Sequence, residues 1–138
     1  MFLRRDENIL GILKVLSETY TPEIKNFRIC ACLADSKGNI IAFGFPRRKS
    51  HPLQKSLSNN ENKLFLHAEV DCLLRGIKKV PKDQWADLSL YLHRSKIIPG
   101  EIKWSNGLCK PCESCNKLIK VFNIRKVLFS TEQGYELL

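Results

Sequence analysis

Four residues in two short motifs have the types and spacing of a catalytic zinc site. His67 and Glu69 stand two residues apart, and Cys112 and Cys115 form a CxxC pair led by Pro111. Zinc prefers four tetrahedral ligands, and catalytic sites take only three from the protein so that water can occupy the fourth place. His67 and the two cysteines are the three candidate ligands. Glu69 is left beside them, where a carboxylate can take a proton from the bound water and deliver it to a leaving amine.

Other interpretations of the cysteines remain open from the residues alone. Cys109 or His93 could supply a fourth protein ligand, which would close the site and make it structural. Such a site has no use for Glu69. An iron–sulfur cluster is disfavoured because the ferredoxin pattern requires a further Cys where Ile119 stands. A redox-active CxxC would leave the His-x-Glu motif unexplained.

Length and composition indicate a single domain over residues 1–138. The hydrophobic fraction of 43% is ordinary for a globular protein, and no apolar run approaches the length of a membrane span. The N-terminus has neither a long apolar stretch nor a cleavage site, so we expect a cytoplasmic protein without a membrane partner. In a reducing cytosol the cysteines stay reduced, and Cys30, Cys32 and Cys72 are predicted to be buried core residues.

The chain is basic, with 23 Lys and Arg against 14 Asp and Glu and a net charge of +9. This charge favours binding to phosphate, either on a nucleotide or along a nucleic acid. Apart from the cluster at 47–49, the basic residues are spread along the sequence. Charge alone therefore does not choose between a small anionic substrate and a polynucleotide.

The pattern of apolar residues predicts elements that place both motifs at helix starts. Helices are expected over 7–19, 67–79 and 111–122, the last one capped by Asn123 in a left-handed conformation. Strands are expected over 27–34, 40–45, 88–93, 127–130 and 135–137, with long loops over 46–66 and 95–110. This order predicts an α/β fold, a three-layer α/β/α sandwich with a mixed sheet of about five strands. The partial positive charge of a helix N-terminus should also favour thiolates at the CxxC pair.

At these motifs the chain resembles the zinc-dependent cytidine and deoxycytidylate deaminase superfamily, whose signature is H-x-E with P-C-x-x-C. The resemblance extends from the hairpin at 27–45 to the strand at 127–130. The segment 124–127 looks like the deoxycytidylate and tRNA-adenosine branch, and His67 stands where short nucleoside cytidine deaminases usually carry Cys. The resemblance implies the cytidine deaminase-like fold, Zn²⁺ as cofactor, and a zinc-bound hydroxide that attacks the amine-bearing ring carbon. It also implies that Glu69 shuttles protons, that ammonia leaves, and that the Ala68 backbone N–H helps to orient the base.

The chain departs from the family pattern after the second predicted strand. Relatives often carry Asn shortly after a Gly there, where it contacts the sugar, whereas here Gly44 and Phe45 are followed by Pro46. The contact is then expected from other residues, with His51 and Gln54 as candidates to line the pocket. Arg47 and Arg48 could pair with a substrate phosphate. The alternative is that these loop residues form only a solvated surface.

Three functions are consistent with the sequence. The first is hydrolytic deamination of a small nucleotide, dCMP to dUMP, by a protein that, like its relatives, forms a homo-oligomer. The second is editing of a base in tRNA or single-stranded DNA, since the net charge permits a nucleic-acid partner and several aromatic residues could stack on a flipped base. Those residues are Phe43, Phe45, Phe65, Tyr91 and Trp104. The third is a non-catalytic binding module whose zinc site is closed by Cys109.

Overall fold

The computed structural model describes residues 2–22, 28–48, 66–98 and 100–138. Its helices are α1 (Arg4–Thr19), α3 (Ala68–Ile77), α4 (Glu113–Phe122) and the short 3₁₀ helix η1 (Lys82–Asp87). Its strands are β1 (Ile29–Ala34), β2 (Ile40–Gly44), β3 (Ser89–Ile97), β4 (Trp104–Gly107), β5 (Lys126–Thr131) and β6 (Gly134–Leu137). Within these residues, no helix has the length and apolar character needed to cross a membrane.

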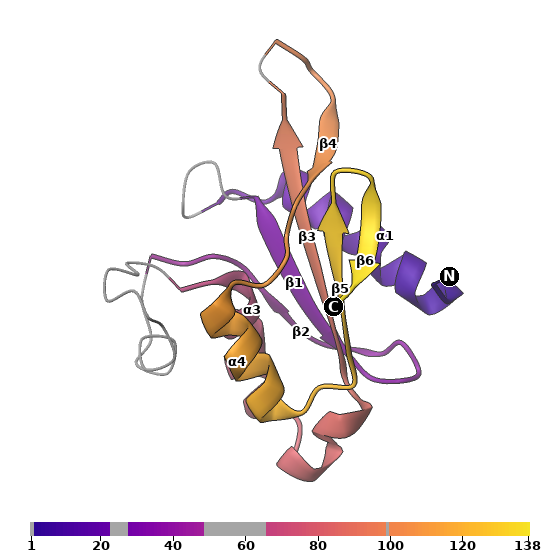
Figure 1. The fold of residues 1–138 in the computed structure, drawn as a ribbon, viewed down its shortest axis with the longest axis vertical. Helices are drawn as coiled ribbons and strands as arrows, with labels where there is room; N and C mark the ends of the chain where they lie inside the picture. The colour runs from indigo at the N-terminus through magenta and orange to yellow at the C-terminus, as the bar shows by residue number, and fades with distance from the viewer. Residues whose placement is uncertain (1, 23–27, 49–65, 99) are drawn as a thin grey trace.

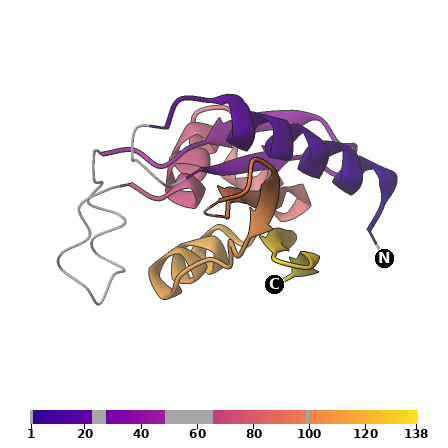
Figure 2. The same cartoon turned by 90° about the horizontal axis from the view of Figure 1, so that it is seen from above.

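The strands form one mixed sheet in the order β2-β1-β3-β5-β6, with β4 paired to the far end of β3. β3 runs antiparallel to β1 and parallel to β5, and β6 returns antiparallel to β5. Seen from above, α1 and α4 lie on opposite sides of the strands (Figure 2). The predicted α/β/α sandwich is therefore confirmed, with six strands in place of about five.

The prediction of a loop over 95–110 is wrong. β3 continues to Ile97, and β4 pairs with it in the register Ile97 to Trp104 and Arg94 to Gly107. The resulting two-stranded ribbon extends beyond the rest of the sheet at the top of Figure 1. Its tip turns through Gly100, whose φ of +89° favours glycine. The segment lacks a strand-like alternation of apolar residues because much of the ribbon is not covered by a helix.

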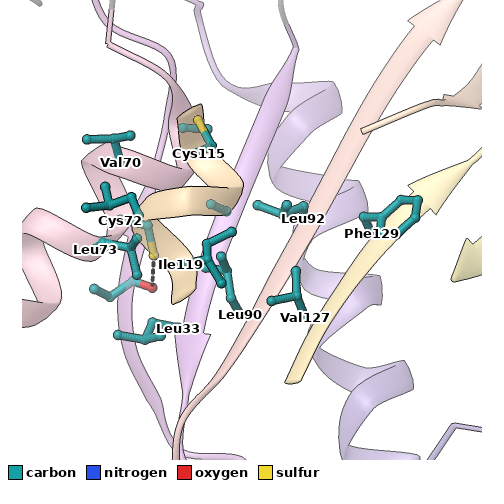
Figure 3. Packing of buried hydrophobic residues seen from close by; sticks show 14 of the residues in the cluster. Leu33, Val70, Cys72, Leu73, Leu90, Leu92, Cys115, Ile119, Val127 and Phe129 are labelled. Atoms are coloured by element: carbon teal, nitrogen blue, oxygen red, sulfur yellow. Dashed lines mark hydrogen bonds between the residues drawn. The ribbon is translucent and has the colours of Figure 1, made fainter. Parts of the chain in front are cut away.

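Alternation along the strands separates two apolar layers. Leu33, Leu90, Leu92, Val127 and Phe129 face α3 and α4, and Figure 3 shows them opposite Val70, Leu73 and Ile119. The other face of the sheet packs on α1 through Cys30, Cys32, Tyr91 and Leu128. Cys30, Cys32 and Cys72 are fully buried, which confirms that they are core residues.

A buried ion pair attaches α1 to the sheet. The Asp6 carboxylate accepts hydrogen bonds from the Tyr91 hydroxyl at 2.5 Å and from the Lys126 ammonium at 2.9 Å. Burial alone would raise the pKa of Asp6, but these hydrogen bonds outweigh it and hold that pKa below its usual value. The helix begins at Arg4, three residues before the predicted start, since Asp6 also accepts from the Leu3 backbone N–H in its first turn.

The elements that carry the motifs lie close to their predicted positions. α3 begins at Ala68 and ends at Ile77, before Pro81, and α4 begins two residues after Pro111. Asn123 ends α4 with φ 54° and ψ 45°, which confirms the predicted left-handed cap. Both motifs thus stand at helix N-termini.

Candidate active site

Two helix starts bring the motifs together. His67 immediately precedes α3 and Cys112 immediately precedes α4, and both residues have extended backbone conformations. Neither side chain caps its own helix, and their side chains instead point to the same place. Cys115 lies one turn into α4, so its sulfur reaches the same point as that of Cys112.

The three candidate ligand atoms fit one tetrahedral ion. The Nδ1 atom of His67 lies 3.5 Å from the Cys112 sulfur and 3.3 Å from the Cys115 sulfur, and all three atoms are within 4.8 Å of one another. Zinc bonds of about 2.1 Å to nitrogen and about 2.3 Å to sulfur at tetrahedral angles would separate such atoms by roughly 3.6 Å. One imidazole nitrogen and two sulfurs are also a donor set that zinc prefers.

The two cysteines have different protonation preferences. A hydrogen bond from Cys115 lowers the pKa of the Cys112 thiol to about 2 against the effect of burial, with further help from His67 and Ser114. The same hydrogen bond, together with burial and the nearby Glu69 carboxylate, raises the pKa of Cys115. This hydrogen bond favours a thiolate at Cys112 and a thiol at Cys115, and the expectation that both residues bind a metal as thiolates stays a prediction. A divalent cation between the sulfurs would favour the thiolate form of both.

Glu69 lies beside the ligands but is not one of them. Its side chain is in the first turn of α3 and is only 7% exposed. Burial raises the pKa of its carboxyl, although the His67 imidazole opposes this shift. A carboxyl group whose pKa is moved toward neutrality can both accept and donate a proton in one reaction cycle.

A cavity of about 160 Å³ opens onto these groups. Its walls include His67, Glu69 and Cys112, so two of the three candidate ligands and the candidate proton carrier face the same space. The other lining residues come from β1, from the segment after β2, from the start of α3 and from the loop before α4; they are Ile29, Pro46, Ala68, Leu108, Cys109 and Lys110. A small planar ligand in this cavity could therefore contact a metal ion and the Glu69 carboxyl at the same time.

The two candidates for a fourth protein ligand lie apart from the cluster. Among the described residues, Cys109 is not part of the group of ligand atoms, although it lines the cavity. Burial raises the pKa of its thiol, and its backbone N–H donates to the Ser130 carbonyl at 2.9 Å. His93 lies on the α1 face of the sheet, where its ring nitrogens contact the Tyr135 hydroxyl at 2.8 Å and the Ser95 hydroxyl at 3.0 Å.

The predicted substrate residues fall into three groups. Ala68 lines the cavity, as expected. Arg47 points elsewhere, because its Nε atom pairs with the Asp71 carboxylate at 3.0 Å, and Arg48 is exposed and outside the lining. His51 and Gln54 lie outside the described residues. A contact of Arg47 or Arg48 with a substrate phosphate stays a prediction.

Asp71 is a positioning residue that the sequence interpretation missed. Its buried carboxylate accepts from the Phe45 backbone N–H at 3.0 Å and pairs with Arg47 and Arg75. It thereby holds the end of β2, and with it Pro46 in the cavity wall, against the first turn of α3. The sequence offers one signal of this role: Asp71 is an acidic residue on the buried, otherwise mainly apolar face of α3.

Comparison with known proteins agrees with this geometry. The family described as the cytidine and deoxycytidylate deaminase zinc-binding region matches residues 4–131. By sequence, no curated protein matches the chain.

Solved structures share the fold at low sequence identity. The apo dCMP deaminase of the cyanophage S-TIM5 is 20% identical, with a TM-score of 0.60 over 94% of this chain and 84% of that one. The same enzyme in complex with dCMP and dUMP is 17% identical, with a TM-score of 0.59 over 94% and 82% of the two chains. A cytidine deaminase from Burkholderia pseudomallei is 14% identical, with a TM-score of 0.62 over 96% and 90%. Because the family match runs through nearly the whole sequence, this protein belongs to the cytidine and deoxycytidylate deaminase family.

Proposed function

We propose that this protein hydrolytically deaminates a cytosine nucleotide, with dCMP as the substrate and dUMP as the product. One observation carries the proposal: the cavity lined by His67 and Cys112, two members of the donor set completed by Cys115, is also lined by the buried Glu69. A purely structural zinc site does not need a cavity or an adjacent carboxyl of raised pKa. Membership of a deaminase family supports a hydrolytic deaminase, and the relative bound to dCMP and dUMP supports a nucleotide substrate.

In the proposed reaction, the zinc ion and the protein's own residues have separate roles. His67, Cys112 and Cys115 would hold the zinc ion, which when bound would supply Lewis-acid activation of water near neutral pH. The reaction replaces the exocyclic amine of cytosine with an oxygen from water and releases ammonia. Glu69 accepts a proton from the attacking water and returns it to the departing amine, so a carboxyl with a raised pKa suits both steps.

Several contacts favour a free nucleotide over a polynucleotide. Two aromatic residues that could have stacked on a flipped base are already engaged. Tyr91 is buried under α1 and donates to Asp6, and the Arg28 guanidinium covers one face of the Trp104 ring at 5.0 Å. The net charge of +9 is the observation that favours the polynucleotide alternative.

Ammonia release by the zinc-loaded protein tests the proposal. The substrates are dCMP, dCTP, deoxycytidine, AMP, guanine, single-stranded DNA and tRNA, each assayed with wild type and with Glu69→Ala. We expect Glu69-dependent release from dCMP. Release only from DNA or tRNA, with steeply salt-dependent binding, would replace the proposal with the polynucleotide alternative. No release from any substrate would contradict both.

A further inference from the structure

The Cys112 sulfur contacts a buried hydroxyl that is not itself a metal ligand. The Sγ atom lies 3.3 Å from the Ser114 Oγ atom, closer than the 3.5 Å that separates it from the His67 Nδ1 atom. This contact has the geometry of a hydrogen bond, and sulfur can accept one from a hydroxyl. Ser114 is one of the two residues between the paired cysteines, and the spacing of the motif does not require a serine there.

The position of Ser114 keeps its hydroxyl beside the ligand. The residue stands in the first turn of α4, two residues after Cys112, and is 4% exposed. Serine is common at helix starts because its hydroxyl bonds local backbone groups or water. Here the hydroxyl is shielded from water and turned back toward the sulfur that precedes the helix. Losing the contact would therefore leave a buried polar group without a replacement from solvent.

Metal binding would fix the direction of this hydrogen bond. A cysteine that holds a metal ion is a thiolate and has no proton to donate. The Ser114 hydroxyl keeps its proton, so it must be the donor and the Cys112 sulfur the acceptor. Such a bond withdraws electron density from the sulfur and helps to orient it toward the ion.

The two cysteine sulfurs have different surroundings. Cys112 lines the active-site cavity and contacts Ser114, whereas Cys115 is 1% exposed and is not among the lining residues. The hydrogen bond therefore acts on the cysteine that faces the substrate space. A sulfur that donates less charge would leave a bound zinc ion a stronger Lewis acid toward water in the cavity.

We propose that Ser114 is a positioning residue of the zinc site, whose hydroxyl orients the Cys112 thiolate and limits the charge that this sulfur donates to the ion. The proposed function supplies the metal on which this inference rests, but the identity of the substrate does not enter it. Removing the hydrogen-bond partner of a metal ligand changes metal affinity or activity by roughly 10- to 100-fold, which is a measurable effect.

Zinc affinity, measured by competition with a chromogenic chelator, is the first test. Ser114→Ala should bind zinc roughly 10- to 100-fold more weakly than wild type, and Ser114→Thr, which keeps a hydroxyl, should restore most of the loss. Ser17→Ala is the matched control. The Ser17 hydroxyl is also buried and lies 2.6 Å from the Ser95 hydroxyl, but it belongs to α1, on the opposite side of the strands from α4. Its removal should leave zinc affinity unchanged.

The absorption spectrum of the Co²⁺-loaded protein is the second test, because it reports on the sulfur itself. The sulfur-to-metal charge-transfer band moves to longer wavelength when a thiolate loses a hydrogen bond and holds its electrons less tightly. Ser114→Ala should show this shift, whereas Ser114→Thr and Ser17→Ala should keep the wild-type band. A serine that merely fills space would leave the band in place in all three variants.

Neither measurement needs turnover, so the inference and the proposed function can fail separately. A Ser114-dependent zinc site in a protein that does not deaminate dCMP would contradict only the proposed function. Wild-type zinc affinity and band position in Ser114→Ala would overturn the inference, as would equal losses in Ser114→Ala and Ser17→Ala. A wild-type protein that binds neither Zn²⁺ nor Co²⁺ would contradict both.

Discussion

Replacing Gly44 with Ala should disturb the active site from the opposite side of α3. Gly44 ends β2 where the first turn of α3 crosses it. A Cβ atom there would lie 2.6 Å from the Cys72 Cβ atom and still closer to the Ala68 carbonyl and the Cys72 backbone nitrogen. To restore an ordinary contact of 3.4 Å, the helix must move by roughly 0.8 Å or more.

The magnitude follows from what obstructs the new methyl group. Overpacking a core costs about 1–3 kcal/mol, and we expect about 3 kcal/mol here because the obstacle is helix backbone rather than a flexible side chain. The same shift displaces His67 and Glu69 relative to the sulfurs of α4. A displacement of about 1 Å at a catalytic site costs on the order of 100-fold in rate. Gly44→Ala should therefore lose stability, zinc affinity and activity together.

Urea unfolding with zinc analysis of the same samples provides the assay, and Gly11→Ala provides the matched control. Gly11 lies within α1, and apart from the backbone of the helix itself no described atom stands within 4 Å of its added Cβ position. Alanine there should stabilise the protein by about 0.5–1 kcal/mol through its higher helix propensity. If Gly44→Ala matched wild type in both urea midpoint and zinc content, the close packing of α3 on β2 would not be what positions the site.

Three further predictions concern pH, the Asp71 carboxylate and the metal. Burial holds the pKa of His93 at about 4, against about 6.5 in the unfolded chain, so only the unfolded state gains a proton between these values. The free energy of unfolding should fall by about 3 kcal/mol as pH drops through that window, as measured by urea unfolding at pH 7 and pH 4. His93→Gln should lose this part of the pH dependence of stability, and an unchanged difference between the two pH values would contradict the prediction. Asp71→Asn should lower the free energy of unfolding by about 1–3 kcal/mol because two ion pairs and a backbone partner depend on that carboxylate, and an unchanged urea midpoint would refute this. Removing the metal with a chelator should lower the thermal midpoint, and Zn²⁺ but not Mg²⁺ should restore it, whereas equal recovery with both ions would argue against a sulfur-containing site.

The site was predictable where short spacings determine it. The positions of His67 and Cys112 before helices follow from the apolar periodicity of 70–77 and 115–122, and a CxxC pair needs no distant partner to bring its sulfurs together. The fold class followed from the order of the same periodic segments. These are local properties of the sequence, and the structure agrees with them.

The parts that were not predicted depend on long-range pairing. Trp104 becomes a strand residue only because Ile97 lies opposite it, and the segment has no alternation that would reveal this. The ion pair of Arg47 with Asp71 was not predicted, because Asp71 lies 24 residues further along the chain.

The central claim is that Glu69 moves protons beside a zinc ion that it does not hold. The most direct test is deamination of dCMP by Glu69→Gln, with zinc content measured on the same sample. We expect zinc to be retained at the wild-type level and turnover to fall by roughly 10²–10⁴-fold, the usual contribution of a positioned acid and base. A zinc-loaded variant that deaminates dCMP at the wild-type rate would contradict the role of Glu69.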